Sequence, residues 1–267
     1  MTTSQPRDPA PDATPFPEPE EAAATAFLPP VPRHRWGFGA FLLVEGVLLA
    51  SAAFVSVLVG NTGPGPLPMR VVLLGTMLPT MIAAGVAVLI TFVRGNGPLS
   101  DLRLEWRWAD VKTGFRYGCV GLVFTTLAAY LWTRLVGDAN ATSAISALVE
   151  DRRMSVSAAL VMFVYLWLLG PICEEIIYRG LLWGAAEQLQ WRSERWGRVA
   201  AFLLSTAVFA ASHLEPLRTT LLLVIAVPIG LVRLVTGRLP GSIVAHQVNN
   251  FLPALTILLG ALGVASF

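Results

Sequence analysis

The chain has 267 residues, of which 55% are hydrophobic and only 13% are charged. That charged share is about half of what an ordinary soluble domain contains, and together with a mean hydropathy of +0.64 it excludes a soluble fold that buries its apolar side chains in a core. The formal net charge of +2 is small, and no basic cluster alternates with aromatic residues outside the apolar runs, which excludes a nucleic-acid-binding protein.

Residues 1–33 differ in composition from the rest of the chain. They are dense in Pro, Ala, Asp and Glu and contain almost no large aliphatic side chains. Such a segment cannot bury enough apolar surface to offset its ordering entropy, so we predict a disordered N-terminal tail. The segment also lacks the basic start, apolar middle and cleavage site of a secretory signal, and we expect the first apolar run to remain as a membrane anchor.

Seven long apolar runs follow the tail, and all but the fifth approach or exceed the roughly 20 residues of a membrane-spanning helix. They cover residues 37–60, 70–93, 113–136, 155–173, 199–213, 217–236 and 242–265. Stretches rich in Gly, Pro and Asn separate the first runs and cannot continue a helix. We therefore predict an all-α, polytopic membrane bundle of about seven, from six to eight, transmembrane helices.

Basic residues gather in the connections that fall on one side of this predicted bundle. They are Arg33, Arg35, Arg94, Arg103, Arg107, Lys112, Arg116, Arg192, Arg195, Arg198, Arg233 and Arg238. The loop over residues 61–69 contains none, whereas Arg134, Arg152 and Arg153 are exceptions on the other side. We expect an integral protein of a bacterial plasma membrane, and by the positive-inside rule its N-terminus should lie in the cytoplasm.

The first group with chemical potential directly follows the fourth apolar run. Ionisable side chains at membrane depth are costly, so each one is a functional hypothesis. On a helix Glu175 and Arg179 are four residues apart and face each other, which predicts a shielded, structural ion pair. Glu174 points about 100° away and is predicted to be available for acid/base work. The alternative is that all three residues mark a helix end whose charges reach the interface.

Two histidines supply the second group. His213 ends an apolar run four residues after Phe209, and His246 lies early in the last run, four residues before Asn250. This spacing places both members of each pair on one helix face. A single histidine is more often a packing group, but two at membrane depth, in a chain with only three histidines, indicate a shared site with Glu174.

The order and spacing of these residues resemble the CAAX prenyl protease and bacteriocin-processing (CPBP, or Abi) family of intramembrane proteases. That family has three short motifs: two glutamates followed after three residues by arginine, Phe-x-x-x-His, and His-x-x-x-Asn. They are matched in this order by Glu174, Glu175 and Arg179, by Phe209 and His213, and by His246 and Asn250. The resemblance covers about residues 155–255 and implies a catalytic membrane core, which we assign to residues 155–267. The N-terminal membrane helices at 34–154 are expected from the apolar runs alone.

The resemblance also implies an activity and a division of labour. The protein would be an endopeptidase that cleaves a membrane-associated or lipidated protein or peptide, possibly a prenylated one, in a lipid bilayer. Glu174 with His213 would orient and deprotonate a water, while His246 and Asn250 would donate hydrogen bonds to the oxyanion. No metal or other cofactor is expected in this mechanism.

Several alternatives remain open at the level of sequence. Glu174, His213 and His246 could form a two-histidine, one-carboxylate zinc site, although the chain has no His-Glu-x-x-His helix. Cys173 could be a nucleophile with His213, but its side chain points about 100° from that of Glu174, and free cysteines in membrane helices are usually packing groups. An ion-coupled transporter, or a catalytically idle immunity or scaffolding protein of the same fold, would carry similar residues.

Overall fold

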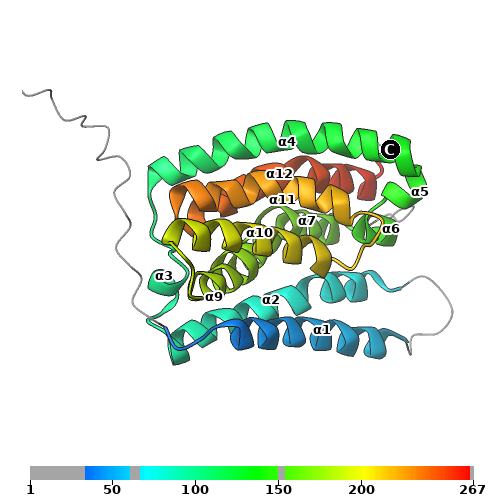
Figure 1. Ribbon diagram of the computed structural model, residues 1–267. Coiled ribbons are helices and arrows are strands. Elements are labelled where there is room, and N and C mark those ends of the chain that lie inside the picture. The colour runs from blue at the N-terminus through cyan, green and yellow to red at the C-terminus, as the bar shows by residue number, and fades with distance from the viewer. Residues whose placement is uncertain (1–33, 61–66, 150–153, 265–267) are drawn as a thin grey trace, which may run out of the picture. The chain divides into compact units, whose positions relative to one another are not determined.

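The computed structural model describes residues 34–60, 67–149 and 154–264, and this part of the chain is helical without any strand (Figure 1). The predicted all-α membrane bundle is therefore confirmed. The predicted disordered tail, residues 1–33, lies outside the described residues. Six helical stretches are long and apolar enough to cross a membrane, which is within the predicted range.

Each of the seven predicted apolar runs corresponds to a helical stretch. The six single helices among them are α1 (Phe38–Gly60), α2 (Met69–Arg94), α4 (Trp108–Val136), α10 (Glu194–Ser212), α11 (Thr219–Thr236) and α12 (Leu239–Ala261). Short helices α3 (Pro98–Asp101), α5 (Asp138–Ala141) and α6 (Ala144–Val149) lie in the connections. Only α10 falls short of a membrane span by composition, because Glu194, Arg195 and Arg198 occupy its first turns.

The fourth run is longer than predicted and is not a regular α-helix. It comprises α7 (Val156–Val164), a π-helical segment η2 (Tyr165–Leu169), α8 (Gly170–Glu175), a second π-helical segment η3 (Ile176–Leu182) and α9 (Trp183–Glu187). The span continues unbroken to Glu187, although the apolar run ends at residue 173. The interpretation of the acidic motif as a helix end is therefore wrong.

Glycines bring α4 unusually close to α11 and α12, along which it runs in Figure 1. A Cβ atom on Gly114 would lie 2.2 Å from the carbonyl oxygen of Gly241, and one on Gly118 would lie 2.7 Å from Val248 Cβ. A Cβ on Gly121 would lie 2.9 Å from Pro228 Cγ. Small residues at such positions allow close backbone approach, which stabilises helix pairs in membranes by van der Waals packing.

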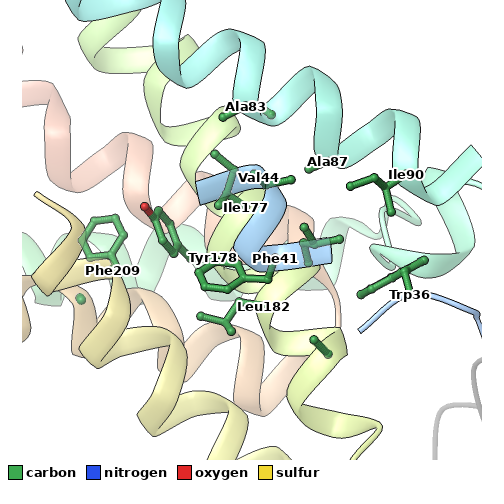
Figure 2. Close-up of a cluster of buried hydrophobic side chains, with 14 residues drawn as sticks. Trp36, Phe41, Val44, Ala83, Ala87, Ile90, Ile177, Tyr178, Leu182 and Phe209 are labelled. Carbon is green, nitrogen blue, oxygen red and sulfur yellow. The ribbon is translucent and has the colours of Figure 1, made fainter. Parts of the chain in front are cut away.

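The hairpin of α1 and α2 packs against the π-helical segment η3 through an apolar cluster (Figure 2). The cluster joins side chains of α1, α2, η3 and α10, including Phe41, Ala87, Ile177, Tyr178 and Phe209. It fixes the segment that directly follows the two glutamates. The motif is consequently held from one side by this cluster and from the other by α11 and α12.

Candidate active site

Glu174 and Glu175 end the short helix α8, which is enclosed by the two π-helical segments. π-helical turns are rare and are found disproportionately at functional sites, because they re-aim side chains within a helix. Amides of α12 bind the first of these segments: Gln247 Nε2 donates to the carbonyl of Leu168 at 3.3 Å. Gly170 and Pro171 lie directly after it, at a point where a regular helix is disturbed.

The pair formed by Glu175 and Arg179 lies in the interior of the bundle, where both side chains have no exposed surface. Arg179 Nη1 donates to Glu175 Oε1 at 3.0 Å, and Arg179 Nη2 donates to the carbonyl of Ala226 in α11 at 3.4 Å. The guanidinium also lies 4.4 Å from the ring centre of Phe209. A buried charge is tolerated when it is paired in this way.

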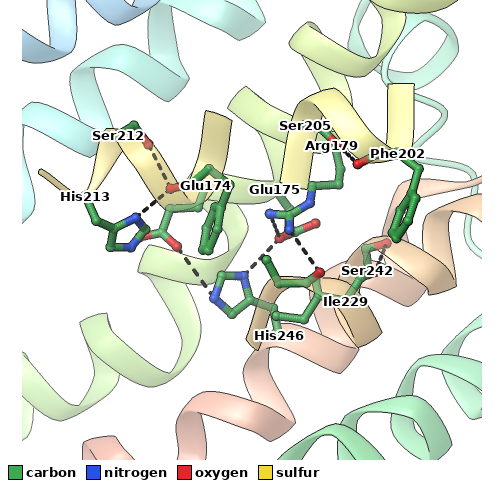
Figure 3. Close-up of polar contacts among 12 residues, drawn as sticks. Glu174, Glu175, Arg179, Phe202, Ser205, Ser212, His213, Ile229, Ser242 and His246 are labelled. Carbon is green, nitrogen blue, oxygen red and sulfur yellow. Dashed lines mark hydrogen bonds and ion pairs between the residues drawn. The ribbon is translucent and has the colours of Figure 1, made fainter. Parts of the chain in front are cut away.

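His246 connects the two adjacent glutamates (Figure 3). Its Nδ1 lies 2.9 Å from Glu175 Oε1, and its Nε2 lies 3.5 Å from Glu174 Oε2. Because Glu175 is paired with Arg179 and only accepts, the hydrogen of this imidazole belongs on Nδ1. The separation from Glu174 is longer than a direct hydrogen bond, and the Glu174 side chain is 25% exposed. Of the two carboxylates, Glu174 is the accessible one.

His213 caps the end of α10, and one of its ring nitrogens is engaged in a hydrogen bond. Its Nδ1 donates to the carbonyl of Phe209 at 2.7 Å, since a carbonyl can only accept. In the neutral ring the lone pair is therefore on Nε2. The Phe209 ring centre lies 4.7 Å from that of His213 and 5.7 Å from that of His246. Phe209 thus contacts both histidines and the arginine of the site.

Asn250 lies in α12, four residues after His246, and is bound to the backbone. Its Nδ2 donates to the carbonyl of Leu166 in η2 at 3.3 Å. One hydrogen of the amide is used in this contact, and the amide carries a second one. The neighbouring Asn249 is buried and accepts a hydrogen bond from Thr125 at 2.9 Å, so the two asparagines face different elements.

The donor set considered for zinc is not arranged as a metal-binding group. Within the described residues, no three His, Cys, Asp or Glu side chains form a group that could hold a metal ion, and this covers Glu174, His213 and His246. We derive no reaction step through a metal. Cys173 is a half-buried free thiol that packs against the apolar cluster of α1, α2 and η3, and this placement favours a packing role.

Two residues near the site were not identified from the sequence. Tyr178 packs its ring at 5.5 Å from that of Phe209, and Glu45 of α1 interacts with the Tyr178 hydroxyl. A signal for Glu45 was available, because it is the only ionisable residue in the apolar run of residues 37–60. Tyr178 gave no signal of its own, since aromatic residues are common in membrane helices.

One of the comparisons with known proteins found a match to the chain. A family model described as Type II CAAX prenyl endopeptidase Rce1-like matches residues 156–252. This stretch extends from the start of α7 into α12 and contains every motif residue described above. The family resemblance predicted from the three motifs is therefore confirmed. No curated protein and no solved structure matches the chain.

Proposed function

We propose, from the match of residues 156–252 to the Rce1-like family model, that this integral membrane protein is an endopeptidase that uses a water activated by Glu174. One observation carries the proposal. His246 is held between two glutamates, and only Glu175 is bound to an arginine, while Glu174 is accessible. The site therefore contains one fixed carboxylate and one available for proton transfer.

The first step is activation of water. Glu174 accepts a proton from a water molecule as its oxygen attacks the carbonyl carbon of the scissile peptide bond. His213 assists, because its Nε2 lone pair can accept the second hydrogen of the same water while Nδ1 stays bound to Phe209. This contact orients the oxygen without removing a second proton.

Attack places a negative charge on the carbonyl oxygen, which needs hydrogen-bond donors. The second amide hydrogen of Asn250 is one candidate donor, since the first is used on Leu166. Nε2 of His246 is the other in the protonated ring. The tetrahedral intermediate then collapses, the C–N bond breaks, and Glu174 passes its proton to the leaving amine. The products are a carboxylic acid and an amine.

The substrate is proposed to be a membrane-associated or lipidated protein or peptide, possibly prenylated. The site lies among helices that are long and apolar enough to cross a bilayer. A soluble peptide would therefore first have to partition to the membrane. We propose that the N-terminal end of α1 faces the cytoplasm of a bacterial cell, because the connections at that end carry most basic residues.

Substitution of Glu174 by glutamine tests this function directly. Glu174→Gln keeps the side-chain shape and removes the proton acceptor, so peptide cleavage should fall by at least about 10²-fold while the protein remains folded and inserted. Comparative proteomics of membranes that carry either chain would identify new protein termini that depend on Glu174. Turnover of an identified substrate would then be measured with purified protein in liposomes.

The matched control is Glu194→Gln, which removes an exposed carboxylate at the start of α10. This variant should cleave at the wild-type rate, because Glu194 lies at the end of the helix opposite His213. Near wild-type turnover by Glu174→Gln would remove Glu174 from the catalytic role.

A further inference from the structure

Glu45 is a buried acidic residue that the proposed reaction does not use. It lies in α1, whose 23 residues contain no other ionisable side chain. Its Oε1 is buried and has no hydrogen-bond partner within the described residues. Ionisable residues inside membrane helices are costly and therefore usually functional, and their partner should be identifiable.

The partner of Glu45 is Tyr178, which follows the glutamate pair by three residues in η3. The Tyr178 hydroxyl interacts with Glu45 and with Ser212 of α10. The ring is 3% exposed and lies between Phe41 of α1 and Phe209 of α10, at 6.3 and 5.5 Å (Figure 2).

Ser212 links this tyrosine to the catalytic histidine next to it in the chain. Ser212 Oγ donates to the carbonyl of Phe209 at 3.0 Å, the same carbonyl that accepts from His213 Nδ1 (Figure 3). Because the Ser212 hydrogen is used there, the single Tyr178 hydrogen can go to Ser212 Oγ. A protonated Glu45 carboxyl group would then donate to the Tyr178 oxygen. In the resulting chain each side chain donates a hydrogen bond to the next, from Glu45 to Tyr178 to Ser212.

We propose that Glu45 is a positioning residue of the site: it holds the Tyr178 hydroxyl against the end of α10 that carries His213. Tyr178 in turn fixes the Phe209 ring, which contacts His213, His246 and Arg179. The helix α1, which has no motif of the family, thereby contributes to the geometry of the water-activating pair. The role in turnover rests on the proposed function, whereas the contact between Glu45 and Tyr178 does not.

Four variants separate hydrogen bonding from charge. Glu45→Leu and Tyr178→Phe should each lower kcat by about 10-fold to 10²-fold with little change in KM, because a misplaced His213 affects the reacting geometry more than substrate binding. The double variant should be no slower than either single one. Glu45→Gln should restore kcat to within about twofold of wild type, since the amide can also donate to the Tyr178 oxygen.

Ser56→Ala is the control in the same helix, because Ser56 is exposed and its hydroxyl binds only the carbonyl of Ala52 four residues earlier. It should leave both kcat and KM unchanged. Wild-type kcat in Glu45→Leu would overturn the proposal. Equal loss in Glu45→Gln and Glu45→Leu would also overturn it, because the role would then depend on charge or proton transfer.

A double-mutant cycle on thermal stability tests the contact between Glu45 and Tyr178 independently of any protease activity. Thermal unfolding in detergent of wild type, Glu45→Leu, Tyr178→Phe and the double variant should give non-additive shifts, since the two side chains interact. Additive shifts would overturn the contact and with it the proposal. Non-additive shifts in a wild-type protein that cleaves no substrate would instead disprove the proposed function and keep the contact.

Discussion

At the scale of single residues, His246 is the group on which the charges of the site converge. It lies between Glu174 and Glu175, and Glu175 is shared with Arg179. Removing one partner of a buried ion pair typically costs about 3 to 5 kcal/mol, because the other charge is left unpaired. Glu175 is therefore a fixed acceptor that sets the orientation of the imidazole, while Glu174 is the accessible carboxylate of the two.

The same residues make a prediction about metal dependence. If Glu174, His213 and His246 bound zinc, purified protein would carry about one zinc per chain, and chelators would abolish activity. Since these side chains do not form a ligand group, we expect activity to survive exhaustive chelation, measured by turnover before and after dialysis against a strong chelator. Stoichiometric zinc, with activity lost on its removal and regained on its return, would contradict the metal-free mechanism.

At the scale of helices, the fourth span explains which part of the site could be predicted from sequence. The spacing of Glu175 and Arg179 was sufficient to predict that they face each other, because side chains four residues apart lie on the same face of a helix. The extension of this helix beyond residue 173 was not predictable from hydropathy. Its charges are compensated by His246 on α12 and by the carbonyl of Ala226 on α11, and such long-range partners are invisible in a local apolar run.

The position of Asn250 illustrates the same limit. Its spacing from His246 predicts a shared helix face, which holds for any α-helix. Its contact with the Leu166 carbonyl depends on the π-helical segment η2. No local pattern predicted that segment, although Gly170 and Pro171, which directly follow it, are residues that disturb a regular helix.

The tight packing of α4 leads to a prediction at the same scale. Gly114→Ala should destabilise the protein by about 1 to 3 kcal/mol, because the new methyl group would lie 2.2 Å from a backbone oxygen, which cannot rotate away as a side chain could. The free energy of unfolding would be measured by denaturant titration in detergent micelles.

The control for this prediction is Gly85→Ala in α2. Gly85 is exposed, and a Cβ atom there would meet nothing within 4 Å. Alanine favours a helix over glycine by up to about 1 kcal/mol, so this variant should be unchanged or slightly more stable. Equal stability of Gly114→Ala and wild type would show that α4 can move away from α12 without loss.

At the scale of the whole described bundle, contacts between helix ends show which of them share an end of the bundle. The start of α1 meets the end of α2 through a hydrogen bond from Arg35 to the carbonyl of Arg94, and the start of α12 meets Arg103. Arg238 before α12 pairs with Asp110 in the first turn of α4, at 2.5 and 3.1 Å. Four of the basic residues that the sequence placed on one side, Arg35, Arg94, Arg103 and Arg238, therefore share one end of the bundle. The end of α12 meets Met154, before α7, at the other end.

This arrangement predicts the membrane topology. Helix α10 begins at the basic end, where Arg198 binds the carbonyl of Leu234 near the end of α11, and the loop after α10 contacts Ala144 at the other end. It should therefore cross the bilayer despite its charged first turns, giving seven crossings. In chains carrying Cys119→Ala and Cys173→Ala, we expect a membrane-impermeant maleimide to label Val264→Cys in intact cells and Arg192→Cys only after lysis, because the basic end faces the cytoplasm. Labelling of both positions from the same side would show that α10 does not cross, and the reverse pattern would invert the proposed orientation.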